Sequence, residues 1–135
     1  MQMQNIAMLL GRVMLAAMFF WTGYGRLMSF SSIHNYVADW SVPGMLKPIL
    51  VAWEIGGGAL ILLGFHTRGA ALSLAIFCVL SSFLVHLHDD DILQLIDFMK
   101  NMALTGGFLY VFACGAGSYS LDARFALKKA AAATA

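Results

Sequence analysis

One acidic side chain, Glu54, stands in the middle of a long apolar stretch. No other Asp, Glu, Lys or Arg occurs between Lys47 and Arg68. A carboxylate at the centre of a bilayer costs about 2.5–3.5 kcal/mol even on the lenient insertion scale, so it needs a partner or a function. Paired with a cation, it is an ionised structural latch; unpaired, it is neutral and able to carry a proton. The sequence leaves both interpretations open.

Arg12 is the partner that the sequence suggests for Glu54. Arg12 lies about six residues into the apolar segment 6–24, and Glu54 lies about nine residues into the segment 45–64. If these segments are antiparallel helices, the two residues differ in height by about 8 Å at the usual helical rise, which two long side chains can close. We therefore expect Glu54 and Arg12 to handle protons together or to form a structural ion pair.

Two glycines share the helical face of Glu54. Gly57 and Gly58 follow it by three and four residues, the spacing of neighbours on a helix surface. Small residues allow membrane helices to approach closely, so helix packing is one interpretation. The other is a ligand-binding cleft lined by bare backbone.

Three more residues are candidates for ligand binding. Lys100 and Asn101 stand near the start of the segment 98–116, where both side chains can face an outward cavity or water. Arg26 follows the end of the first apolar segment, which also suits an anchor whose charged head reaches the membrane interface.

Metal and redox chemistry have weaker signals. His86, His88 and the three aspartates 89–91 offer imidazole and carboxylate ligands, but their spacing matches no established metal signature, and we predict no metal site. The only cysteines, Cys78 and Cys114, lie in separate apolar runs without a CxxC pair, so we expect packed thiols and no disulfide.

The composition indicates which elements must position these residues. Of 135 residues, 61% are hydrophobic and only 11% are charged, whereas soluble domains carry about 25% charged residues. Lipid is therefore the expected surrounding, and the net charge of +1 gives no reason to expect a nucleic-acid partner. A chain of this length allows a single domain with about four membrane spans.

We predict an all-α integral membrane four-helix bundle. Backbone groups must pair within each segment inside a bilayer, so the apolar segments are expected to be helices. Tyr36 and Trp40 suggest a short interfacial helix in the first outer loop. The predicted spans are about 6–24, 45–64, 69–87 and 98–116, followed by a cytoplasmic tail at 117–135 whose AAAATA end is expected to be frayed.

The distribution of basic residues sets the expected orientation. Arg68, Arg124, Lys128 and Lys129 fall on the side of both termini, against Arg26, Lys47 and Lys100 on the other. Because cytoplasmic loops carry an excess of Lys and Arg, both termini are expected in the cytoplasm.

Four stretches, in order, resemble the DoxX family of small four-helix bacterial inner-membrane proteins. LLGRVMLAAMFFWTGYGRL at 9–27 is similar to its Arg-containing first helix that ends in Gly-x-Gly-Lys, with Arg26 at the lysine position. VPG at 42–44 resembles the entry to its second helix. WEIGGGALILLGFHTRGAA at 53–71 resembles its Glu-x-x-Gly-Gly and Leu-Gly-x-x-Thr-Arg patterns. The stretch 99–124 resembles its Lys-Asn-x-x-x-x-Gly-Gly helix and the following Gly-x-Gly-x-x-Ser-x-Asp.

The resemblance implies a bacterial inner-membrane location and an association with quinone-linked redox enzymes, thiosulfate:quinone oxidoreductase among them. The chain shows no haem-ligand pair, CxxC or nucleotide loop of its own. The first hypothesis is therefore a quinone-interacting or accessory subunit of a membrane redox complex, with quinone as its only candidate cofactor and a redox enzyme as partner. A structural membrane protein and a small proton-coupled transporter acting as a homo-oligomer remain as alternatives.

Overall fold

A computed structural model describes residues 2–29, 47–85 and 92–133, and every regular element in these ranges is a helix. The five helices are α1 (Gln2–Ser29), α2 (Lys47–Leu63), α3 (Thr67–Val85), α4 (Ile92–Cys114) and α5 (Leu121–Ala133). The all-α prediction is therefore confirmed for the described residues. The predicted interfacial helix and the cluster at residues 86–91 lie outside these ranges.

The helices match the predicted apolar segments with shifted ends. By length and apolar composition, one described helix segment, Gln2–Met28, is able to cross a bilayer, and Pro48–Leu63 and Thr67–Phe83 are shorter apolar helices. Helix α4 begins at Ile92, six residues before the predicted span, because the amphipathic stretch around Asp97 continues the same helix.

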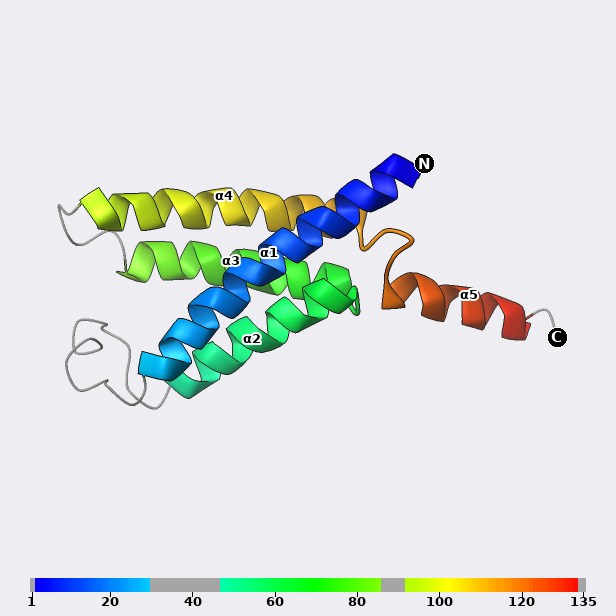
Figure 1. Cartoon of the computed structure of the whole chain (residues 1–135), viewed down its shortest axis with the longest axis horizontal. Coiled ribbons are helices and arrows are strands. Elements are labelled where there is room, and N and C mark those ends of the chain that lie inside the picture. Colours follow the sequence, from blue (N-terminus) through cyan, green and yellow to red (C-terminus); the bar gives the residue numbers. More distant parts are fainter. Residues whose placement is uncertain (1, 30–46, 86–91, 134–135) are drawn as a thin grey trace.

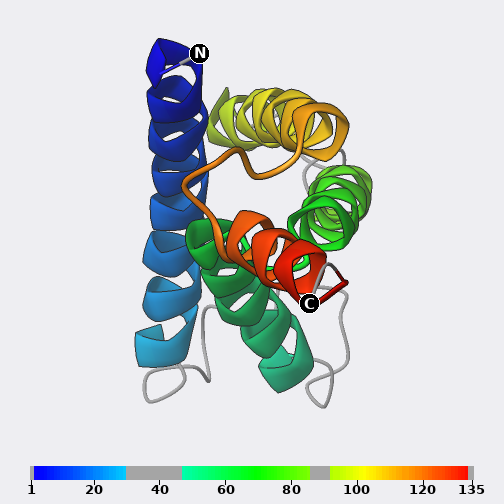
Figure 2. The same cartoon turned by 90° about the vertical axis from the view of Figure 1, so that its right-hand side faces the viewer.

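The first four helices pack side by side in chain order. Helix α1 lies against α2, α2 against α3, and α3 against α4, while α4 also contacts α1. Figures 1 and 2 show α1 crossing α3 and α4 at an incline rather than parallel to them. The beginning of α1, the α2–α3 turn and the end of α4 all lie at the end of the molecule from which α5 extends. We call this the terminal end.

Glycines set the register between α1, α2 and α3. A Cβ on Gly23 would lie 2.7 Å from Ile55, one on Gly58 would lie 3.3 Å from Phe19, and one on Gly57 would lie 2.7 Å from Leu74. Since a larger residue at any of the three positions needs its neighbour to move, the helices approach closely because these residues are small.

The turn between α2 and α3 ends α2 in a Schellman motif. The Phe65 N–H donates to the Leu60 carbonyl at 3.0 Å and the Gly64 N–H donates to the Ile61 carbonyl at 3.2 Å. Gly64 adopts a φ of +67°, the left-handed conformation that glycine takes at a helix end without steric cost. This turn brings the first residues of α3 to the terminal end.

The alanine-rich end of the tail, which was expected to be frayed, is instead helical as far as Ala133, the last residue of α5 (Leu121–Ala133). The Ser120 side chain caps this helix, since its hydroxyl oxygen accepts from the Ala123 N–H at 3.2 Å, the usual N-cap bond. The alanine-rich sequence that follows has the highest intrinsic helix propensity, which explains why the segment is ordered as a helix.

Candidate functional site

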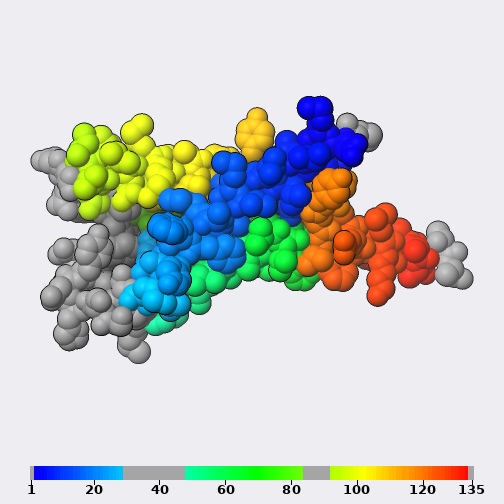
Figure 3. Space-filling view, viewed as in Figure 1, coloured from blue at the N-terminus to red at the C-terminus, as the bar shows by residue number. Residues whose placement is uncertain are grey.

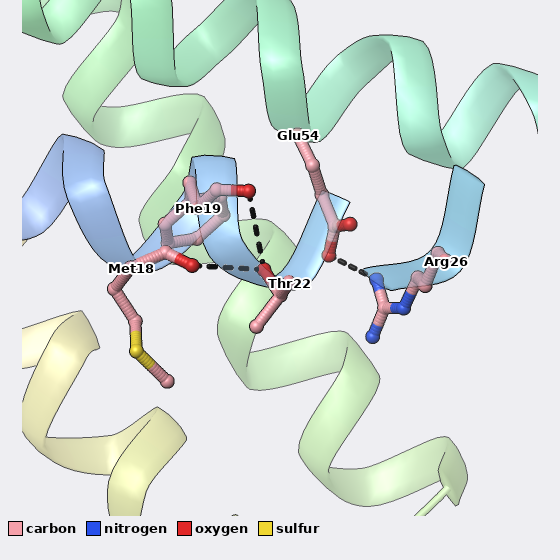
Figure 4. Close-up of polar contacts among 5 residues, drawn as sticks. All are labelled: Met18, Phe19, Thr22, Arg26 and Glu54. Carbon is pink, nitrogen blue, oxygen red and sulfur yellow. Dashed lines mark hydrogen bonds and ion pairs between the residues drawn. The ribbon is translucent and has the colours of Figure 1, made fainter. Parts of the chain in front are cut away.

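Glu54 forms an ion pair with Arg26 of α1. Arg26 Nη1 donates to Glu54 Oε1, as Figure 4 shows. The Glu54 side chain is 3% exposed and that of Arg26 is 31% exposed, so the carboxylate is enclosed while the guanidinium partly reaches the surface. The second carboxylate oxygen, Oε2, is buried and has no hydrogen-bond partner. The pair therefore leaves one acceptor of a buried acid unsatisfied.

The surroundings of this pair are mostly apolar. The Thr22 hydroxyl, next to the pair in Figure 4, donates to carbonyls of its own helix, Met18 at 3.1 Å and Phe19 at 3.2 Å. The thiol of Cys78 on α3 is 1% exposed and lies within electrostatic reach of Glu54. The thiol is free, as is that of the exposed Cys114.

The predicted ion pair between Arg12 and Glu54 is wrong. The prediction measured height from the expected ends of the apolar segments, whereas the close approach of Gly23 to Ile55 fixes the register of α1 and α2. Arg12 precedes Gly23 by eleven residues, so it lies about 16 Å from the level of Glu54 along the helix axis. Arg26, less than one turn after Gly23, is the residue within reach.

Of the remaining predicted ligand-binding residues, Lys100 has a partner on its own helix. It pairs with Asp97, and the two side chains are 38% and 44% exposed. The side chain of Asn101 is half-buried. Gly57 and Gly58 are buried against Leu74 and Phe19, an arrangement that agrees with helix packing. A ligand-binding role for these four residues stays a prediction.

Arg12 instead joins three parts of the chain at the terminal end. It is 1% exposed, and its guanidinium donates to the Ile61 carbonyl of α2 at 3.4 Å and to the Tyr119 carbonyl of the segment before α5. A Cβ on Gly64 would collide with this guanidinium and with Ser120. The glycine thus leaves the space that the arginine head occupies.

Asp122 binds the start of α3 from α5. Its Oδ1 accepts from the His66 N–H at 2.8 Å, and its Oδ2 accepts from the Thr67 N–H at 2.9 Å and the Thr67 hydroxyl at 2.7 Å. The Asp122 N–H donates to the Gly64 carbonyl at 2.9 Å. The carboxylate thereby satisfies amides that a helix N-terminus leaves without intrahelical partners.

These bonds favour the charged form of Asp122. Partial burial acts to raise the pKa of Asp122, but the hydrogen bonds from Thr67 and His66 outweigh it, and the pKa lies below its usual value. A carboxylate whose pKa is lower in the folded state stabilises the fold above its unfolded pKa and loses that contribution as the pH falls through the folded pKa.

We expect Asp122→Asn to destabilise the protein by about 1 kcal/mol at neutral pH, the typical effect of losing a helix-capping side chain. The difference from wild type should shrink as the pH falls below about 4, where unfolded aspartate takes up protons, and should vanish once the pH is below the lowered pKa of the folded carboxylate. Unfolding in detergent at several pH values measures both effects. Asp97→Asn on the exposed face of α4 is the matched control, and an Asp122→Asn effect equal to it contradicts the capping role.

The group of contacts around Arg12 and Asp122 was not predicted from the sequence. The residues that form it, Arg12, Gly64, Thr67, Ser120 and Asp122, all fall in the stretches that carry the family resemblance. The signal in the sequence that could have pointed to this group is that its polar residues and glycine fall within three of the stretches that carry the resemblance. Only the tertiary structure shows that these stretches meet at one end of the molecule.

The Glu54–Arg26 pair combines two chemical capacities in one place. Arg26 presents hydrogen-bond donors, and the Oε2 atom of Glu54 is an acceptor without a donor. An enclosed acid–cation pair of this kind is able to orient a polar ligand head and to take up or release a proton.

Comparisons with known proteins identify the family. The DoxX family profile matches residues 7–87. The chain is 34% identical over 121 residues to inner membrane protein YqjF of Escherichia coli (strain K12), covering 90% of this chain and 93% of that protein. It is 32% identical over 127 residues to inner membrane protein YphA of the same organism, covering 88% and 90%. No solved structure matches. With its matched profile and two full-length relatives, the chain belongs to the DoxX family.

Proposed function

We propose that this protein is a multi-pass inner-membrane four-helix bundle. The names of its two relatives support the location. Large apolar side chains are exposed on each of α1 to α4, among them Trp21, Ile76, Leu109 and Phe112. Soluble monomers rarely expose extended apolar surface, whereas lipid tails cover it without cost.

The proposed orientation has both termini in the cytoplasm. The terminal end gathers the start of α1, the α2–α3 turn and α5 (Figure 1), which agrees with an even number of crossings. Arg68, Arg124, Lys128 and Lys129 belong to this end, and an excess of basic residues marks the cytoplasmic side.

Within the membrane, we propose that the Glu54–Arg26 pair binds the head of a quinone and that the protein serves as an accessory subunit of a redox enzyme. The observation that carries this proposal is the buried Glu54 Oε2 without a hydrogen-bond partner beside a guanidinium. A quinone supplies the exchange of two electrons and two protons with a partner enzyme. Arg26 would donate a hydrogen bond to a head-group carbonyl, and Glu54 would hold or release a proton.

The proposal predicts that purified protein binds a short-chain ubiquinone and that Glu54→Gln and Arg26→Gln each weaken this binding by about tenfold or more. The reason is that a hydrogen bond to a charged group contributes about 1.5–3 kcal/mol, and about 1.4 kcal/mol corresponds to tenfold in affinity. Equilibrium dialysis in mild detergent measures the dissociation constants.

Asp97→Asn is the matched control, because it also removes one carboxylate from an ion pair but on an exposed face. Equal and negligible binding by wild type and variants rejects the quinone proposal. If both variants then differ from wild type in stability alone, the pair is a structural latch. Copurification of a redox enzyme with the wild-type protein tests the accessory role.

A further inference from the structure

A layer of apolar side chains separates the Glu54–Arg26 pair from the polar contacts at the terminal end. Phe19 of α1, Ile61 of α2, Leu74 of α3 and Phe108 of α4 are all 4% exposed or less. They belong to one buried cluster, and each helix from α1 to α4 contributes one of them. We call these four residues the apolar layer.

The register of the helices places this layer between the two polar groups. Phe19 packs on Gly58, and Leu74 packs on Gly57, one turn beyond Glu54 in the direction of the terminal end. The rings of Phe19 and Phe108 meet edge to face with centroids 5.2 Å apart. Arg12 lies beyond the layer, where it reaches the Ile61 and Tyr119 carbonyls.

The helix segments that form the layer carry no charged side chain. The segments 13–25, 55–65, 69–85 and 101–114 contain no Asp, Glu, Lys or Arg. Ser73, next to Leu74 on α3, donates its hydroxyl to the Ala70 carbonyl of its own helix at 3.0 Å. Closely packed interiors leave few voids larger than a water molecule, so the packed rings and aliphatic chains block water on this side.

On the opposite side of the pair, the described residues include a partly exposed arginine. The Arg26 side chain, which reaches the surface there, is 31% exposed. Among the residues that the structure describes, the titratable groups that interact with Glu54 from the neighbouring helices are Arg26 on α1 and Cys78 on α3. The charged pair of α4, Lys100 and Asp97, lies in the same half of the molecule, since the rings of Phe98 and Phe83, near the end of α3, meet edge to face.

From this arrangement we infer that the Glu54–Arg26 pair exchanges protons and water only with the aqueous phase opposite the terminal end. The inference deepens the proposed function, on whose site it rests, by assigning a side of the membrane to its proton exchange. With the proposed orientation, that side is the periplasm. A proton released by Glu54 would then leave outward, and none would cross to the cytoplasm through this protein.

Sided thiol labelling tests the inference in membrane vesicles of both orientations. The two native cysteines are first replaced by Cys78→Ala and Cys114→Ser. In this protein a single cysteine is introduced at one of two positions, by Glu54→Cys or by Thr22→Cys. The second substitution leaves the Glu54–Arg26 ion pair in place. Ser118→Cys, on the exposed segment before α5, marks the terminal side. A charged, membrane-impermeant methanethiosulfonate should modify positions 54 and 22 at least about tenfold faster from the side opposite Ser118→Cys, because the closed layer excludes it from the other.

Two further variants make the result specific to the layer. Leu74→Cys, as the single cysteine, should react from neither side. Phe108→Ala, added to the Glu54→Cys protein and to the Thr22→Cys protein, should make both cysteines reactive from the terminal side as well. Equal rates from both sides, faster labelling from the terminal side, or no labelling of either position before denaturation overturns the inference. If the reagent reaches positions 54 and 22 from one side only but the protein does not bind ubiquinone, the quinone proposal alone is rejected. If the protein binds ubiquinone but the reagent reaches these positions from both sides, this inference alone is rejected.

Discussion

Arg12→Leu is expected to lower the free energy of unfolding by about 3 kcal/mol or more, because hydrogen bonds from a charged donor contribute about 1.5–3 kcal/mol each. Arg12 makes two of them, to the carbonyls of Ile61 and Tyr119, and it is 1% exposed. The substitution leaves both carbonyls without this donor and removes the cation that interacts with Asp122. Unfolding in mixed micelles with increasing SDS measures the loss.

The Arg12→Leu variant should also weaken the attachment of α5 to the rest of the protein. Since Arg12 holds the Tyr119 carbonyl and Asp122 holds the start of α3, losing the first contact weakens the docking of α5. Limited proteolysis should cut the 115–120 segment faster in Arg12→Leu. Arg124→Leu, which removes an exposed arginine of α5, is the control and should leave stability and cleavage near wild type. Equal behaviour of the two variants contradicts the role assigned to Arg12.

Arg26→Gln is expected to destabilise the protein more than Glu54→Gln, by about 2 kcal/mol against about 1 kcal/mol. Removing one partner of a buried pair costs about 3–5 kcal/mol because the other charge stays uncompensated, and we reduce this figure because Arg26 is partly exposed to solvent screening. Arg26→Gln leaves a carboxylate that is 3% exposed, whereas Glu54→Gln leaves a guanidinium that is 31% exposed and able to reach water.

Unfolding of both single variants and of the double variant tests this asymmetry. The double variant should be closer to wild type than Arg26→Gln alone, because it leaves no unpaired charge. Lys100→Gln, in the exposed pair with Asp97, is the control and should cost less than about 1 kcal/mol. If Glu54→Gln proves the more damaging change, the carboxylate has a further partner and the pair is not the main electrostatic contact at this site.

The two polar groups thus lie on opposite sides of the apolar layer and have different character. At the terminal end, Arg12 and Asp122 bind mainly backbone groups, so they fix where α1, α3 and α5 meet. On the other side, Glu54 has an unsatisfied oxygen and a partly exposed partner. Each group also keeps one buried polar atom without a hydrogen-bond partner, Arg12 Nε in the first and Glu54 Oε2 in the second, so the difference lies in the partly exposed partner of Glu54. The second group is the one for which ligand binding is proposed.

The helical class, the approximate positions of the apolar helices, the family resemblance and the choice of Glu54 as a residue that needs a partner could all be predicted from the sequence alone. These features depend on local composition: apolar runs long enough for a membrane, glycines at helical spacing, and a carboxylate whose burial requires an explanation. Each can be recognised from the order of residues along the chain, without knowledge of which segments meet in space.

The identity of the cation that pairs with Glu54, and the contacts of Arg12, could be read only from the packing of the helices. Arg12 and Arg26 lie on the same helix, and the choice between them depends on the register of α1 against α2. That register follows from the fit of Gly23 to Ile55 and of Gly58 to Phe19, a packing relation between segments that no periodicity within either one contains. The docking of Asp122 on Thr67 is decided in the same way, because the partners are 55 residues apart in the chain.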